Sequence, residues 1–451
     1  MPHIYAYMDE LLKDFLPATA ADWKARLEKD LKGITFDQLS LTDRNGITIR
    51  PFYNREDIAI PPEPIVTQPG WSICAQIKVS DAATANKRAL YELNNGASGI
   101  CFMLEEDIDA ETLLQEIELP YIYTCFRLSR YLPAFIQSLQ TYAMQKGWSW
   151  KEMESFIAFD YIAGYIQEGH WQAGREQDQQ SFEAFLEATQ GMHNLCIDAA
   201  LFQNAGATAT YELAAALAQV NEYLNQPEVR QQLQQARKIH ITLAAGTAFF
   251  EQIAQLRAFR NLLHLLLEQY NVQPAIHLHI ETGNIYRSPF DSYSNLLRDT
   301  IAAMAGVLGD CNSLYIRSFN ETLKEADDFS RRMSRNQQLI FKEESYLDKV
   351  ADVAAGSYYI ETLTDEIAAK AWQQFKDIEA TGGLIAAFEK GIIGQSIGQQ
   401  ATQLIQEYKE GKRVLIGVNK FPNPKDEPKT TGRETSSNGG LQQLSLADHI
   451  I

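Results

Sequence analysis

Two histidines and a glutamate have a spacing that could bring their side chains together in one binding site. His277, His279 and Glu281 alternate in the stretch IHLHIE. On a β-strand, residues two apart point to the same face, so the imidazoles and the carboxylate would lie together. These groups are Zn²⁺ ligands, and a metal-dependent barrel hydrolase is therefore one hypothesis. The other predicted strand ends offer no matching pair of histidines or aspartates, which favours hydrogen-bonded histidines or a vestigial ligand pocket.

Other reactive residue types give weaker signals. Asp160 and Asp198 fall in predicted strands, but their spacing assigns no acid–base pair. The arginines near predicted helices and loops are Arg257, Arg260, Arg287 and Arg317. Serine, cysteine and lysine do not stand in a recognisable nucleophile motif. The residue types alone therefore leave the chemistry open.

The elements that must position these residues form a repeating pattern. From Pro69 onward, short apolar segments of strand length alternate with longer segments that have helical periodicity. The predicted strands begin at Trp71, Ala97, Pro120, Ser155, Met192, Lys238, Ala275 and Asn312. Eight such strand–helix units over about 250 residues predict an α/β fold of the TIM (β/α)8 barrel type. The alternative, a doubly wound sheet, needs a glycine-rich loop where this chain has QIKVSDAATA.

A TIM barrel places its functional residues at the C-terminal ends of its strands. The residues expected there are Asp160, Leu201 to Asn204, Ala244 to Thr247, His279 to Asn284 and Arg317 to Asn320. The barrel is predicted over 70–320, with a helical extension over 321–421. An N-terminal arm, 1–69, is expected to contain short helices at Tyr5–Leu16 and Ala20–Leu31 and to contact this barrel or another subunit. The polar segment 422–451 predicts a flexible linker.

Composition excludes several classes of protein. The net charge of -18 argues against nucleic acid as a partner, because a phosphate backbone requires a cationic face. The apolar runs are too short for a membrane span, and the N-terminus does not resemble a signal peptide, so we expect a cytoplasmic protein. The five cysteines lie in or beside apolar runs, which predicts buried free thiols. They are Cys74, Cys101, Cys125, Cys196 and Cys311.

Several blocks of the sequence occur in a characteristic order. They include GITIRPFYNRED, NAGATATYELAAALAQVNEYL, SRRMSRNQQLIFKEES, KVADVAAGSYYIETLTDEIAAKAW and VLIGVNKF. Together they resemble the methylmalonyl-CoA mutase family from Asn45 to Phe421, most weakly over 100–190. That family uses adenosylcobalamin to interconvert methylmalonyl-CoA and succinyl-CoA. The resemblance implies a TIM barrel that encloses the CoA thioester, in agreement with the strand count.

The departures from the family pattern concern its active site. Leu201 stands where the resemblance places the histidine that hydrogen-bonds the thioester carbonyl, and leucine can neither donate a hydrogen bond nor transfer a proton. The family's HxQTSGW becomes HIETGNI, which keeps His279 and Thr282 but introduces Glu281, a carboxylate expected to repel an anionic ligand. The RGYDSD loop lacks a counterpart in CFMLEEDIDAETLL, and TYIFPP is replaced by GYIQEGHWQ.

The resemblance is therefore to the small, non-catalytic subunits of heterodimeric bacterial members. It implies that this chain has no catalytic residue and binds no metal or cofactor, since the cobalt-ligating Asp-x-His-x-x-Gly motif is absent. Adenosylcobalamin would belong to the assembled enzyme. The vestigial pocket would comprise Gln203, Asn204, Arg257, His279, Glu281 and Thr282. The implied partner is a large catalytic subunit, or a second copy when the chain is isolated. The alternative is an active acyl-CoA mutase barrel with a separate cobalamin-domain chain.

Overall fold

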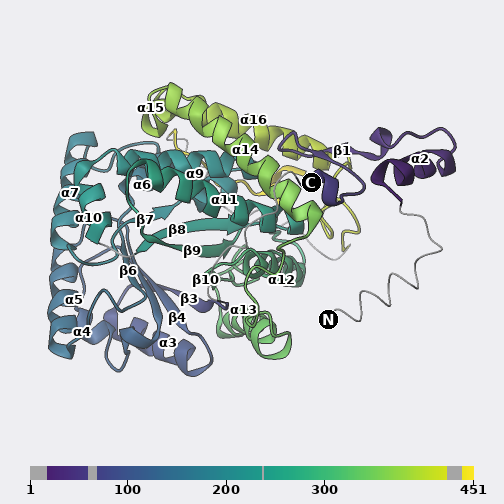
Figure 1. Ribbon diagram of the computed structural model, residues 1–451. Helices are drawn as coiled ribbons and strands as arrows, with labels where there is room; N and C mark the ends of the chain where they lie inside the picture. Colours follow the sequence, from purple (N-terminus) through teal and green to yellow (C-terminus); the bar gives the residue numbers. More distant parts are fainter. Residues whose placement is uncertain (1–17, 59–68, 236–237, 424–438, 451) are drawn as a thin grey trace, which may run out of the picture.

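Eight parallel strands form the centre of the fold (Figure 1). The computed structural model describes residues 18–58, 69–235, 238–423 and 439–450. The strands run in the order β6-β5-β4-β3-β10-β9-β8-β7, and a parallel bridge between Phe156 and His193 joins the two outer edges into a barrel. Their bounds are β3 Ser72–Val79, β4 Gly99–Leu104, β5 Tyr123–Leu128, β6 Ser155–Ala158, β7 Cys196–Asp198, β8 Lys238–Ala245, β9 Ala275–Thr282 and β10 Ser313–Tyr315. The predicted TIM barrel and all its strands are confirmed.

The strands are buried on both faces, which explains their nearly continuous apolar sequences. In β5, Phe126 belongs to the core beneath the helices, whereas Tyr123 and Cys125 join a second cluster inside the barrel. All five cysteines are buried and free, as predicted. Alternation along each strand therefore decides which side chains reach the barrel interior.

Helices between the strands cover the outer face of the barrel (Figure 1). They are α3 Ala82–Asn94, α4 Ala110–Leu113, α5 Pro133–Lys146, α6 Tyr161–Glu168, α7 Arg175–Ala188, α8 Ala200–Asn204, α9 Ala209–Leu224, α10 Pro227–Gln235, α11 Phe249–Gln269, α12 Ser292–Leu308 and α13 Asp328–Leu339. A second layer comprises α14 Tyr358–Ala380, α15 Leu384–Glu389 and α16 Ile392–Lys409. Because α14 packs on α9 and α11, nearly all of α9 is buried, and its alanines permit this close packing. Among the described residues, no helix is long and apolar enough to cross a membrane.

The described part of the N-terminal arm has one docked and one projecting portion. The strands β1 Leu41–Thr42 and β2 Thr48–Ile49 form a hairpin. In its turn, Asn45 accepts a hydrogen bond from the backbone N–H of Thr210 at 3.1 Å and donates one to Glu251 at 3.0 Å. The helix α2, Ala20–Asp30, confirms the second predicted arm helix and projects from the main body (Figure 1). The first predicted helix, Tyr5–Leu16, lies outside the described residues.

The described end of the tail is packed on the barrel, which corrects the prediction of a linker for this part of 422–451. The backbone N–H of Leu444 donates to the carbonyl of Asn204 at 2.7 Å, and that of Leu446 donates to Ile285 at 3.2 Å. Leu446 is 1% exposed and begins the short helix α17, Leu446–Ile450. Polar composition predicted a linker, but the leucines spaced along LQQLSL bury against the barrel. Residues 424–438 lie outside the described part.

Substitution of Leu446 by alanine should detach this segment. Removal of a fully buried leucine side chain costs about 2–5 kcal/mol, so we expect at least about 2 kcal/mol less protection of the Leu444 and Leu446 amides in hydrogen exchange. Gln442→Ala, at an exposed position of the same segment, is the matched control and should change protection by less than about 0.5 kcal/mol. Equal effects of the two substitutions would contradict the docking of this segment.

Candidate functional site at the barrel mouth

The lower part of the barrel interior is a stack of aromatic and imidazole rings around Tyr123. The Tyr123 hydroxyl lies 2.8 Å from Nε2 of His240, and its ring stacks on His277 with centroids 4.9 Å apart. Oγ of Ser313 lies 2.9 Å from Nε2 of His277 and 2.8 Å from Nδ1 of His279. Burial lowers the pKa of all three imidazoles, which keeps them neutral.

The predicted common orientation of His277, His279 and Glu281 is confirmed, and Nε2 of His279 lies 3.7 Å from Glu281, but each of the three also pairs with other protein groups. Both histidines pair with Ser313, and Glu281 pairs with arginines. Within the described ranges, no group of three or more histidine, cysteine, aspartate or glutamate residues is arranged to hold a metal ion. This geometry gives the metal-dependent hydrolase hypothesis no support.

Above the ring stack, an ion-pair network crosses the barrel mouth. One carboxylate oxygen of Glu281 on β9 lies 3.0 Å from Nη2 of Arg127 on β5, and the other lies 2.6 Å from Nη2 of Arg317, just after β10. Asp198 at the end of β7 lies 3.5 Å from Nη1 of Arg127. Burial alone would raise the pKa of Glu281, but the two guanidinium groups together hold it well below its usual range. Glu281 is therefore an ionised cross-link between two strands and the end of a third.

The network neutralises itself, which corrects the expected effect of Glu281. Its two guanidinium groups balance the carboxylates of Glu281 and Asp198, so Glu281 does not present an unpaired charge to a ligand. Arg317 also donates to the backbone carbonyl of Thr282 at 2.9 Å, and the hydroxyl of Thr282 accepts from the Arg317 backbone N–H at 3.0 Å. A cavity of about 210 Å³ remains beside the network, lined in part by Arg127, Asp198 and Thr242. Pockets for drug-sized ligands generally start at about 300 Å³.

The lip of the mouth is α8, which follows β7. Nε2 of Gln203 donates to the backbone carbonyl of Ala244 at 2.9 Å, and Oδ1 of Asn204 accepts from the backbone N–H of Asn284 at 2.8 Å. Leu201 is half-buried and packs against the main hydrophobic core. The polar residues of the lip thus hold neighbouring loops together.

Comparisons with known proteins agree with this architecture. Residues 104–445 match the family model for methylmalonyl-CoA mutase. A methylmalonyl-CoA mutase small subunit from Porphyromonas gingivalis is 30% identical over 446 residues, which cover 92% of this chain and 71% of that protein. The chain belongs to the methylmalonyl-CoA mutase family.

Further members of the methylmalonyl-CoA mutase family differ in how much of this chain they match. The small subunit from Streptomyces virginiae is 28% identical over 459 residues, covering 93% of this chain and 73% of the relative. The large subunit from Propionibacterium freudenreichii subsp. shermanii is 36% identical over 225 residues, covering only 49% of this chain and 31% of the relative. Both small subunits thus match nearly the whole chain.

Arg257 is separated from the other residues predicted for a vestigial pocket. It lies within α11, and its guanidinium forms ion pairs with Asp352 and, at 2.8 Å, with Glu361 at the start of α14. All three side chains are almost fully buried. The structure therefore corrects the assignment of Arg257 to the pocket, because a buried arginine that is paired twice joins two helices instead. Gln203, Asn204, His279, Glu281 and Thr282 do lie at or inside the mouth.

Sequence reasoning missed Arg127 and left the role of Asp160 open. The predicted third strand ended at Phe126, but β5 continues to Leu128. Arg127 therefore follows Tyr123 and Cys125 on the face that points into the barrel.

The carboxylate of Asp160 accepts four hydrogen bonds, from Tyr223, Gln219 and two backbone N–H groups. Burial raises its pKa to about 6. It caps α6 and positions the end of β7.

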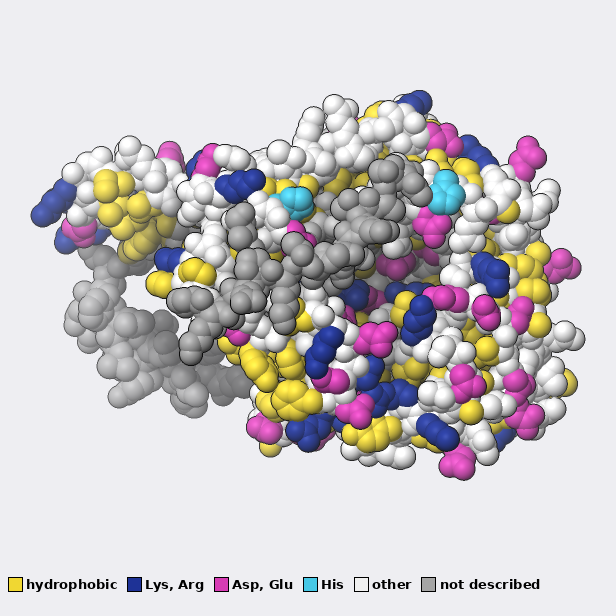
Figure 2. All heavy atoms as spheres, turned by 180° about the vertical axis from the view of Figure 1, so that it is seen from behind, with side chains coloured by type: hydrophobic (Ala, Val, Ile, Leu, Met, Phe, Trp, Pro, Cys, Tyr) yellow, Lys and Arg dark blue, Asp and Glu magenta, His cyan; other side chains and the backbone are white. Residues whose placement is uncertain are grey.

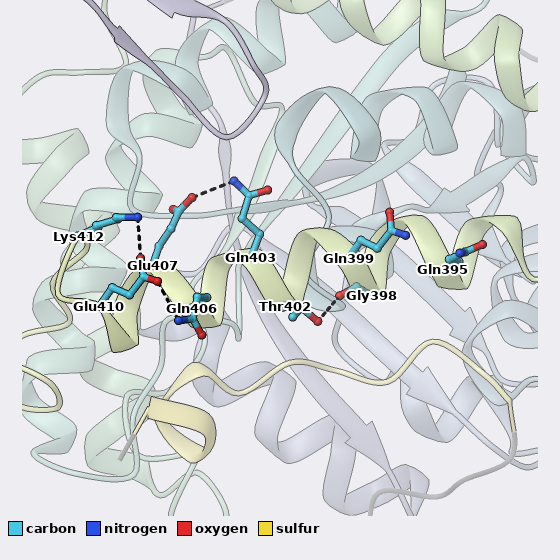
Figure 3. A pocket seen from close by; sticks show the side chains of 9 residues that line it. All are labelled: Gln395, Gly398, Gln399, Thr402, Gln403, Gln406, Glu407, Glu410 and Lys412. Carbon is cyan, nitrogen blue, oxygen red and sulfur yellow. Dashed lines mark hydrogen bonds and ion pairs between the residues drawn. The ribbon is translucent and has the colours of Figure 1, made fainter.

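A wide hollow on the outer surface offers no comparable set of converging groups. It lies along α16, has a volume of about 790 Å³ and is lined by glutamine, threonine, glutamate and lysine side chains (Figure 3). Several of these side chains pair along the helix, including Gln403 with Glu407 at 3.1 Å and Glu410 with Lys412 at 2.6 Å. The barrel mouth, where ionised side chains from several strands converge, is the candidate site.

Substitution of Glu281 by glutamine should reveal the strength of the mouth network. Removing one charge of a buried ion pair strands its partners, and because both arginines are partly exposed we expect a loss of about 3 kcal/mol in unfolding free energy at pH 7. The lowered pKa of Glu281 gives stability that is present above the unfolded-state value of about 4.3 and is lost as pH falls through the folded-state value. The difference in unfolding free energy between wild type and variant should therefore become smaller below about pH 4. Denaturant unfolding across this pH range is the measurement.

Glu105→Gln supplies the matched control for this experiment. Glu105 forms an exposed ion pair with Lys78 at 2.8 Å, with side chains 60% and 69% exposed. Such pairs contribute at most about 1 kcal/mol. If Glu281→Gln cost no more than Glu105→Gln at pH 7, the mouth network would not be a stabilising cross-link.

Proposed function

We propose that this chain is the non-catalytic small subunit of an adenosylcobalamin-dependent methylmalonyl-CoA mutase. In this proposal it acts in the cytoplasm as half of a heterodimer and supports a large subunit that interconverts methylmalonyl-CoA and succinyl-CoA. The observation that carries the proposal is the network of Arg127, Glu281 and Arg317, which occupies the mouth of the barrel with self-neutralised charge. An acyl group could occupy the space between β5, β9 and the chain after β10 only by displacing these paired side chains.

The lip supports the same proposal. Family resemblance aligns Leu201 with the histidine that hydrogen-bonds the thioester carbonyl, and an aliphatic side chain cannot stabilise developing charge on that oxygen. Loss of one such donor generally costs a factor of about 10² to 10³ in rate. Two relatives called small subunits match more than nine-tenths of this chain, and a relative called methylmalonyl-CoA mutase does so as well, at a lower identity of 27%.

The residues of the mouth do not fit adenosylcobalamin. His240, His277 and His279 are buried inside the barrel in contact with Tyr123 or Ser313, so they cannot reach a cobalt ion placed above the mouth. The tail crosses the same side of the barrel, from a backbone bond at Ile166 to one at Ile285. We therefore assign the cofactor to the large subunit in the assembled enzyme.

The proposal predicts where turnover resides. The isolated chain, supplied with methylmalonyl-CoA and adenosylcobalamin, should show no succinyl-CoA formation, whereas its co-purified complex with the large subunit of the same genome should be active. Leu201→His should leave the kcat and KM of the complex unchanged, because this barrel does not perform the reaction. Gel filtration with mass measurement should give one copy of each chain per complex.

Three results would contradict this assignment. The first is turnover by the isolated chain or by this chain combined with a cobalamin-domain protein alone, which would favour the active-mutase alternative. The second is failure of the wild-type chain to associate with the large subunit. A large increase in activity on Leu201→His would likewise show that this barrel binds and orients the substrate.

A further inference from the structure

The small cavity beside the ion-pair network of the barrel mouth is acidic. It has a volume of about 210 Å³, and among the described residues that line it the charged ones are Glu105, Arg127, Asp160, Glu168 and Asp198. The charge of Arg127 is already matched, because its guanidinium lies 3.0 Å from Glu281 and 3.5 Å from Asp198. The lining therefore holds four carboxylates beside one arginine that is engaged elsewhere.

Two of these carboxylates, Asp160 and Glu168, have no lysine or arginine partner in the described part of the chain. Asp160 accepts hydrogen bonds from neutral donors alone. The ion-pair neighbour of Glu168 is the imidazole of His170, at 3.8 Å. Burial raises the pKa of Asp160 to about 6, which leaves it ionised at neutral pH. The cavity thus has two negative charges that the protein does not balance.

Two polar atoms of the lining lack a hydrogen-bond partner among the described residues. They are Oδ1 of Asp198 and Nδ1 of His240, and both atoms are buried. His240 is 1% exposed, and its Nε2 lies 2.8 Å from the hydroxyl of Tyr123. In the tautomer whose Nε2–H donates to the Tyr123 oxygen, Nδ1 is an acceptor. A buried acceptor without a partner is costly, so these atoms mark a place for a ligand that donates hydrogen bonds.

The ligand that fits this lining is a short aliphatic diammonium ion. An ammonium group has three N–H donors and no acceptor, which matches the two unpartnered atoms. Apolar groups of Cys125, Ala158 and Ile197 also line the cavity and suit a chain of methylene groups. The side chain of Glu168 is 49% exposed, so it lies toward solvent and can receive the second ammonium. At about 30 Å³ for each water of the bulk liquid, the cavity corresponds to about seven waters, the size of a four-carbon diamine.

Other ligand classes suit the cavity less well. Within the described ranges, no group of histidine, cysteine, aspartate or glutamate residues is arranged to hold a metal ion. A carboxylate ligand would face the uncompensated charges of Asp160 and Glu168. On the face seen from behind, acidic and basic side chains are interspersed (Figure 2). A diamine therefore meets no extended acidic patch on that face, and the net charge of -18 gives only a general attraction.

We infer that the mouth cavity binds a small aliphatic diamine, with one ammonium between Asp198 and His240 and the other at Glu168. The inference goes beyond the proposed function, because it concerns a ligand of this chain alone and needs no large subunit. Asp198 accepts a hydrogen bond from the inner ammonium, whereas Asp160, whose oxygens are already bonded, acts on it through its charge.

Calorimetric titration of the full chain with putrescine tests the inference. Putrescine should bind saturably with one molecule per chain. Propylamine, which lacks the second ammonium, should bind about 10-fold more weakly, and succinate should not bind. Asp198→Asn should weaken putrescine binding at least about 10-fold, because it removes the charge from a hydrogen bond to an ammonium.

Two further variants test the cavity and its outer end. Gly164 lies in α6 and lines the cavity, and a Cβ at this position would meet open space. Gly164→Leu should abolish putrescine binding without removing a charge, and its fold should be retained because leucine favours a helix more than glycine does. Glu168→Gln should weaken putrescine about 10-fold and leave propylamine unchanged. Glu111→Gln, at an exposed position of α4, is the matched control and should change neither affinity.

Several outcomes would overturn the inference. One is the absence of putrescine binding, and another is binding of succinate in its place. A third is a Gly164→Leu variant that is folded, as thermal unfolding shows, and still binds putrescine as tightly as the wild type. A fourth is equal weakening by Glu111→Gln and Asp198→Asn, which would indicate attraction to net charge alone. None of these outcomes affects the proposed function, which is tested by association with the large subunit.

Discussion

The pairing of Glu281 with Arg127 and Arg317 is the interaction on which the interior of this barrel depends. It ties β9 to β5 across the barrel and to the chain just beyond β10, and it does so in a buried setting where an unpaired charge would be costly. Each arginine requires Glu281, and Glu281 requires both arginines for its ionised state. The mouth is therefore stabilised as a closed polar layer, and no member can be altered alone without stranding the others.

The polar residues around this layer serve the same structural purpose. Gln203 and Asn204 hold the loops after β8 and β9, and Asp160 fixes the start of α6 and the end of β7. The tail adds a further cover through backbone bonds to Asn204 and Ile285. Groups that could bind a ligand in an open barrel are thus used to bind one another.

The exterior carries exposed apolar side chains, among them Tyr293 and Leu297 on α12. The interior of the barrel and this exterior are physically linked. Arg287 and Arg317 lie in the loops that lead into α12 and out of β10. Because Arg287 pairs with Asp299 of α12 and Arg317 pairs with Glu281, these loops connect the mouth to the position of α12.

The sequence by itself determined the barrel, because strand and helix periodicities are local and their eightfold alternation admits few topologies. It also determined the common orientation of His277, His279 and Glu281, since alternation along a strand requires only backbone geometry. Only the tertiary structure decided the partners. Arg127 and Glu281 are 154 residues apart, and Arg257 meets Glu361 across 104 residues. Such pairings depend on which strands and helices become neighbours, which the local pattern does not encode. The prediction of the tail as a linker failed for the same reason. Its polar composition can be read locally, whereas the burial of its leucines depends on the surface that the barrel provides.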